Sequence, residues 1–132
     1  MDSSSIQLAD SEIDAIEQSD AHLRIHFSRA VIIKTMTGSA EKTLWWQTGN
    51  LILEAPEIEG DIPDVPLTCT GGDIDDNIYT YRDMIPLPLA SRGVIRVVLH
   101  SEGDQPALVA SGSAIHLDMH DVPKYQRHIR DD

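Results

Sequence analysis

The sequence predicts an all-β protein: an antiparallel β-sandwich or, as the alternative, a partly open β-barrel, with short helical turns at both termini. Three observations support this prediction. Apolar and polar residues alternate in several short runs, these runs are rich in β-branched residues, and turn-forming residues separate them at hairpin-like spacing. Segments with helical periodicity, which would connect parallel strands, do not lie between the runs.

Residues 1–20 are expected to form an acidic N-terminal arm, followed by a single β domain over residues 21–132. Ser11 and Asp14 have the spacing of a short helix-capping pattern, and Ile13 and Ile16 have the spacing of one helical face. The arm is therefore predicted to contain at most two helical turns.

The first strand is predicted over residues 22–33, where Leu23, Ile25 and Phe27 alternate with polar residues. The alternation is interrupted near Ser28, which predicts a β-bulge at that point. Further strands are predicted over residues 42–47, 51–53, 78–82, 94–100 and 107–120.

Glycine and proline predict the connections between these strands. Turns are expected at residues 37–39, 48–50, 70–73 and 101–104. Three prolines in residues 56–66 favour a loop or a protected edge strand, because each proline lacks a backbone N–H for the ladder. Residues 85–89 are predicted to be an extended, polyproline-like connector, and residues 122–130 to form one or two helical turns beginning near Pro123.

The core is predicted to contain five apolar residues from the two clearest strands: Ile95, Val97, Leu99, Ile115 and Leu117. The single cysteine, Cys69, has no internal disulfide partner and is expected to be a small buried hydrophobic residue. The first residues have neither the cationic region nor the following apolar region of a secretory signal peptide. We therefore expect the protein in the cytoplasm.

Most of the net charge of −12 comes from two segments. Residues 1–20 hold six acidic residues and no basic residue, and residues 54–76 hold eight acidic residues and no basic residue. Such a surface repels nucleic acid and anionic membranes, and it favours a basic protein partner or another copy of the chain. The simpler interpretation is that these segments are solvated loops.

Four histidines fall in two similar pentads, His22 to His26 and His116 to His120. On a strand, alternate residues share a face, so His116, Asp118 and His120 point the same way, as do the two histidines of the first pentad. Residues four apart on one strand lie about 13 Å from each other, so a shared metal ion requires the two strands to be neighbours. We expect no cofactor, with a divalent transition metal bound by the pentads as the alternative. The simpler interpretation of the pentads is a solvated polar face on which Arg24 pairs with Asp118.

Trp45 and Trp46 are the strongest indication of a binding surface. Adjacent residues on a strand point to opposite faces, so both rings are buried only where both faces of the sheet are covered. Covering by a loop is one interpretation, and contact with a partner protein is the other, since aromatic anchors are enriched in interfaces.

No motif in the sequence predicts catalysis: it has neither a nucleophile elbow nor a glycine-rich phosphate loop. The function predicted is a non-catalytic protein-binding or accessory module, inhibitor- or immunity-like or oligomer-forming. The alternative is a small metal- or ligand-binding β-barrel protein that uses the histidine pentads.

Overall fold

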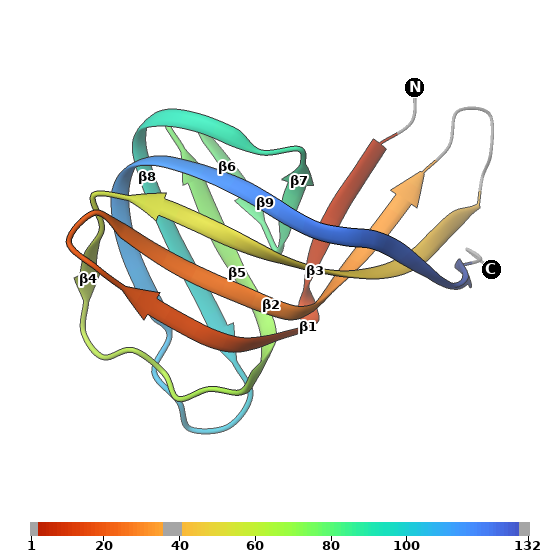
Figure 1. Ribbon diagram of the computed structural model, residues 1–132, viewed down its shortest axis with the longest axis horizontal. Helices are drawn as coiled ribbons and strands as arrows, with labels where there is room; N and C mark the ends of the chain where they lie inside the picture. The colour runs from red at the N-terminus through yellow and green to blue at the C-terminus, as the bar shows by residue number, and fades with distance from the viewer. Residues whose placement is uncertain (1–2, 36–40, 130–132) are drawn as a thin grey trace.

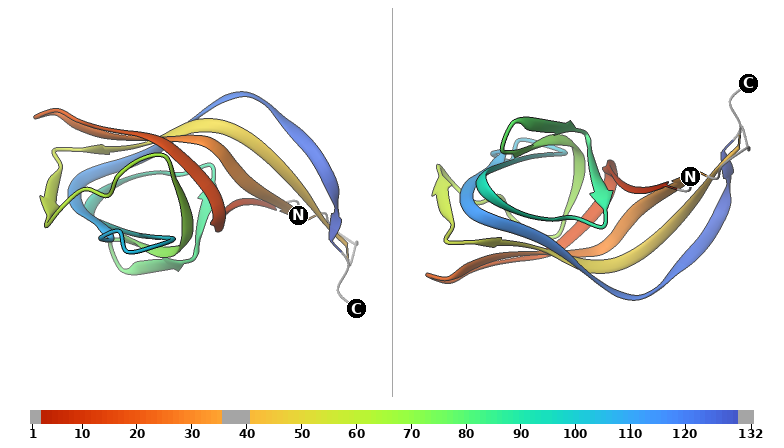
Figure 2. Two further views of the ribbon diagram at one scale, coloured as in Figure 1. Left: turned by 90° about the horizontal axis from the view of Figure 1, so that it is seen from below. Right: turned by 90° about the horizontal axis from the view of Figure 1, so that it is seen from above.

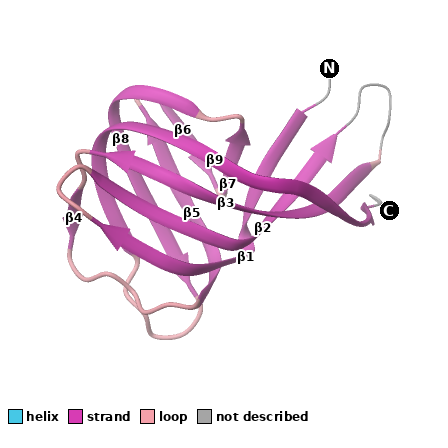
Figure 3. Cartoon of the chain, in the orientation of Figure 1, coloured by secondary structure: helices cyan, strands magenta, loops and turns pink. Residues whose placement is uncertain are grey.

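A computed structural model describes residues 3–35 and 41–129 of the chain. These residues form nine strands and no helix (Figures 1 and 3), which confirms the all-β prediction. The strands are β1 (Ser3–Gln18), β2 (His22–Thr35), β3 (Lys42–Glu54), β4 (Glu57–Glu59), β5 (Leu67–Asp76), β6 (Tyr79–Arg82), β7 (Met84–Leu87), β8 (Ala90–Ser101) and β9 (Leu108–Ile129). The described parts of the chain include no helix long and apolar enough to cross a membrane.

All strand pairs are antiparallel and belong to one sheet, in the order β6-β5-β8-β9-β3-β2-β1-β7, with β4 paired to β9. A further pairing of β1 with β5, through Glu12↔Thr68 and Ile13↔Leu67, closes part of the sheet into a ring. Figure 2 shows this ring end-on. The strands therefore form one antiparallel sheet that is curled into a ring.

The core fills the inside of the ring. Ile95, Val97, Leu99 and Ile115 are buried together, and Leu117 packs against them at the edge of the cluster, as predicted. Strict alternation puts these side chains inward, because a strand turns every second residue toward the same face. In the first half of β9 the even-numbered residues Leu108 and Ala110 are buried in the same core.

Four strands continue beyond the ring and form a projecting arm (Figure 1). We call these parts of β1, β2, β3 and β9, residues 3–7, 31–35, 42–46 and 124–129, the strand arm; β7 pairs with its β1 edge. Register shifts fall in every one of the four strands where the ring ends and the strand arm begins, including the bulge predicted near Ser28. Bulges increase local bending and twist, so their alignment redirects the sheet away from the ring.

The helical turns expected at the N-terminus are not present, because this segment is strand β1. Ile13 pairs with Phe27 and Ile16 with Ile25, so pairing with β2 overrides the weak helical spacing. Ser11, which we expected to cap a helix, is buried at the β1 bulge. Its Oγ donates to the Gln7 carbonyl at 2.6 Å and accepts a hydrogen bond from the Val31 N–H at 3.0 Å.

The helical turns expected near the C-terminus are also wrong. Residues 124–129 form the outer strand of the arm, with Trp46 opposite Lys124 and Lys42 opposite Ile129. The backbone hydrogen bonds to β3 decide the conformation of this segment.

Two of the expected turns lie inside strands, and one lies outside the described residues. β5 runs through residues 70–73, and its actual turn is at Asn77 and Ile78; β3 runs through residues 48–50. Glycine at position 72 does not form a turn but lets β5 pack closely against β8, since a Cβ there would lie 2.2 Å from the Val98 carbonyl oxygen. The turn expected at residues 37–39 falls in the part of the chain that the structure does not describe.

Candidate functional site

The two tryptophans are consecutive residues of β3 in the strand arm, and both are partly buried. Trp45 packs against the core cluster, its Nε1 donates to Thr43 Oγ1 at 2.8 Å, and its ring meets Tyr125 edge-on at 5.4 Å. The Lys34 ammonium lies 4.3 Å from the centroid of the Trp45 ring. These contacts hold Trp45 as part of the arm's structure.

The side chain of Trp46 lies on the other face of the arm from that of Trp45. In the ladder between β2 and β3, Trp46 pairs with Val31. The Lys124 ammonium lies 4.7 Å from its ring centroid. Trp46 is partly exposed, and a cation over an aromatic face at such a site contributes about 0.5–1 kcal/mol, so a partner surface can displace it at little cost. Of the two partly buried tryptophans, Trp46 is the one that does not pack against the core cluster.

The strand arm is basic, although the chain is acidic. Its four segments hold four basic residues and no acidic residue: Lys34, Lys42, Lys124 and Arg127. These residues are far apart in the sequence and become neighbours through the pairing of β3 with β2 and β9. Glu41 lies just before β3, and its Oε2 is 3.8 Å from His128 Nε2.

The outer strand of the arm has an open edge. β8 pairs with β9 only as far as His116 and β4 only as far as Ser111, so in the described chain the second half of β9 has β3 as its sole strand partner. An edge strand presents unpaired N–H and C=O groups to which another strand can add. Pro123 and the basic side chains reduce unselective pairing along this edge.

The histidine pentads lie on β2 and β9, with β3 between them. Across the sheet, His26 is opposite Asn50, which in turn is opposite Asp118. The two pentads are therefore two strand spacings apart, about 10 Å. Each has its own local partners: His26 Nδ1 is 2.5 Å from Asp14 Oδ1, and His120 Nε2 is 3.4 Å from Asp118 Oδ2.

Arg24, expected opposite Asp118, pairs with Glu17 on β1 at 2.7 Å. Among the described residues no group of three or more His, Cys, Asp or Glu side chains is placed to hold one metal ion. A site formed by His22, His26, His116, Asp118 and His120 stays a prediction. Metal analysis of the purified protein, with and without chelator, tests it.

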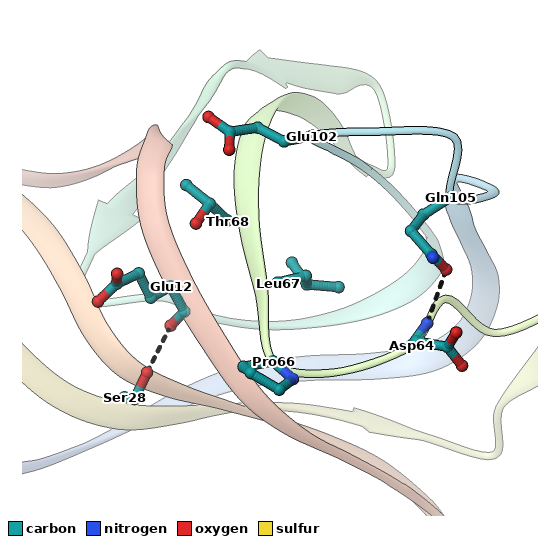
Figure 4. A pocket seen from close by; sticks show the side chains of 8 residues that line it. All are labelled: Glu12, Ser28, Asp64, Pro66, Leu67, Thr68, Glu102 and Gln105. Carbon is teal, nitrogen blue, oxygen red and sulfur yellow. Dashed lines mark hydrogen bonds between the residues drawn. The ribbon is translucent and has the colours of Figure 1, made fainter.

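A hollow of about 550 Å³ lies beside the seam where β1 meets β5 (Figure 4). Its lining includes the carboxylates of Glu12, Asp64 and Glu102 and no histidine, cysteine or lysine. The Ser28 hydroxyl donates to the Glu12 carbonyl at 3.3 Å, and Gln105 accepts from the Asp64 N–H at 3.0 Å. Nucleophilic catalysis needs a hydroxyl or thiol held against a base, whereas the Ser28 hydroxyl of this lining is bonded to a backbone carbonyl.

Cys69 is buried, as predicted. Burial raises the pKa of its thiol to about 12, so the thiol is protonated at neutral pH and is a poor nucleophile.

No protein-family model matches this chain, and comparison with curated proteins and with solved structures finds no match either.

Proposed function

We propose that this protein is a non-catalytic protein-binding or accessory module, inhibitor- or immunity-like or oligomer-forming, and that the strand arm is its contact surface. The observation that carries the proposal is the projection of a basic, tryptophan-bearing arm from an otherwise acidic chain. We expect it to act in the cytoplasm, without a cofactor.

Three properties of the arm support protein binding. Trp46 has a partly exposed ring that does not pack against the core cluster, and aromatic residues dominate the energetics of interfaces. The open edge of β9 offers backbone hydrogen bonds to an added strand. The four basic side chains attract an acidic partner and increase the rate of association.

The same charges argue against nucleic acid as the partner. Four basic residues attract phosphate, but the chain as a whole carries a net charge of −12 and repels a polyanion as it approaches. An acidic protein surface of limited size meets the arm without facing the rest of the molecule, so a protein partner fits the charge distribution better.

The test is recovery of partners from nuclease-treated native extract, using immobilised wild-type protein, Trp46→Ala and Tyr79→Ala. Tyr79 is 66 % exposed and lies outside the arm, so its truncation is a matched aromatic control. We expect wild type and the control to recover the same protein, Trp46→Ala to release it faster, and salt to slow association for all three. Recovery of no protein and no self-association, or equal retention by Trp46→Ala, contradicts the proposal.

A further inference from the structure

We propose that the partner of the strand arm is a second copy of this chain, and that the basic β9 edge of one copy, residues 124–129, pairs with the acidic β4 edge of the next. This inference rests on the proposed function of the arm and names its partner. The copies then associate head to tail.

The two surfaces have complementary charge. Residues 54–64, which include β4, hold five acidic residues and no basic residue: Glu54, Glu57, Glu59, Asp61 and Asp64. Glu59 lies 3.6 Å from Arg96, with both side chains largely exposed, and Glu57 is exposed. Lys124 and Arg127 face this segment in the proposed contact, where opposite charges steer association and fix which edges meet.

Both edges are free to pair. Among the described strands β4 has only β9 as a partner, through Glu57↔Ser111 to Glu59↔Val109, so its other side is open. Positive φ angles at Ala55 and Gly60 end this strand on both sides and keep it to three residues. Such a short edge forms few backbone hydrogen bonds, so the selectivity of pairing depends on the flanking charges.

Other open edges of the sheet suit the arm less well. On β1 the carboxylates of Asp14 and Glu17 are already paired with His26 and Arg24. The edge strand β6 carries a basic residue, Arg82, which repels the arm. Among these described edges, the β4 edge combines an open ladder with two exposed carboxylates, of which Glu59 is paired with Arg96 at the longer distance of 3.6 Å.

An apolar counterpart for Trp46 lies next to β4. Ile62 and Val65, 38 % and 39 % exposed, are two of the exposed large hydrophobic residues, and both lie in the loop that follows β4. An interface that pairs the edges therefore also has apolar surface within the same segment of chain. Such surface stabilises a complex whose formation is steered by charge.

The strand arm and β4 lie at opposite ends of the longest dimension of the molecule (Figure 1). A contact between unlike surfaces at opposite ends leaves one free arm and one free β4 edge on every pair. Such heterologous contacts continue into chains, or into rings where the rotation closes. The expected assembly is therefore larger than a dimer and grows with concentration.

The experiment is sedimentation velocity of the full chain over a concentration series at 0.1 M and 1 M salt. At 0.1 M the mean mass should rise with concentration above the monomer mass of 14.6 kDa. It should return toward the monomer at 1 M salt, because the Debye length falls from about 10 Å to about 3 Å. Circular dichroism and thermal unfolding of each variant verify that it folds.

Charge-swapped variants identify the surfaces. Lys124→Glu with Arg127→Glu, and separately Glu57→Lys with Glu59→Lys, should each weaken association at least about tenfold. Combining all four substitutions in one chain restores complementarity and should restore association. Arg82→Glu, a single charge reversal on an edge outside the contact, should associate as wild type.

Three outcomes overturn the inference: a chain that is monomeric throughout the series, association that survives either double substitution, or a quadruple variant that does not recover. If only Lys124→Glu with Arg127→Glu loses association, the contact is an arm-to-arm dimer, and this result also overturns the inference. If the chain is monomeric but wild type still recovers another protein through Trp46, this inference fails and the proposed function stands. If neither occurs, both fail.

Discussion

Replacing Ser11 with alanine tests the role of the β1 bulge in joining the strand arm to the ring. The hydroxyl lies inside the protein and bonds two backbone groups, the Gln7 carbonyl at 2.6 Å and the Val31 N–H at 3.0 Å. Ser11→Ala leaves both groups without this hydrogen-bond partner, the Val31 N–H in a buried position and the Gln7 carbonyl in a part-buried one. A buried backbone group left without a hydrogen bond costs about 1–3 kcal/mol, so we expect the free energy of unfolding to fall by about 2–5 kcal/mol.

The measurement is equilibrium unfolding in urea, followed by tryptophan fluorescence and by circular dichroism. Both tryptophans lie in the arm, so fluorescence reports the arm while circular dichroism reports all strands. A loss of this size is a large share of the roughly 5–15 kcal/mol that stabilises an ordinary domain. We also expect faster exchange of the Val31 amide hydrogen.

Ser28→Ala is the matched control. Its exposed hydroxyl donates to the Glu12 carbonyl at 3.3 Å near the same bulge. Water replaces this bond, so the change should stay below about 0.5 kcal/mol. Equal effects of Ser11→Ala and Ser28→Ala, or a loss below about 1 kcal/mol for Ser11→Ala, refute the reasoning.

Three further predictions concern the packing of single residues. Trp45→Ala should lower the free energy of unfolding by about 2–4 kcal/mol and Trp46→Ala by about 1 kcal/mol, because only the first ring packs on the core; equal losses in urea unfolding contradict this. Burial raises the pKa of Cys69 from 9.0 to about 12. Above pH 9 the unfolded chain loses this proton and the folded chain keeps it, so stability should fall by up to about 1.4 kcal/mol per pH unit, a slope that Cys69→Ala should remove. Gly93→Ala should lower the melting temperature more than Gly103→Ala: both glycines have positive φ, but only at Gly93 would a Cβ meet an amide oxygen, at 2.0 Å.

Local alternation made much of the fold predictable from the sequence. The strand around Ile95 to Leu99, the bulge near Ser28 and the buried Cys69 are all present. In each case a β-strand with one buried face leaves a period of two in its own residues, so no knowledge of the neighbouring strand is needed.

The parts of the fold that failed depend on neighbouring strands. Gly71 and Gly72 give a turn signal, yet they lie within β5, where neighbouring side chain and backbone approach closely. Both terminal segments look weakly helical, and pairing with β2 or β3 makes them strands. Local propensity is a weak indicator where tertiary pairing supplies the hydrogen bonds.

The candidate site was partly predictable for the same reason. That Trp45 and Trp46 point to opposite faces follows from their adjacency on a strand and is confirmed. The basic character of the arm and the separation of the histidine pentads depend on strand order, with β3 between β2 and β9. Nothing in the local pattern of residues specifies that order.

The seam of the ring has a consequence for how the chain folds. Two ladder pairs in the described chain, which connect residues 12–13 with residues 67–68, join β1 to β5. Forming them closes a long loop of chain for few backbone hydrogen bonds, so we expect the seam to close late, after the β1–β2–β3 meander has formed. Until then both of its edges are open, and the folding intermediate is more prone to aggregation than the native state.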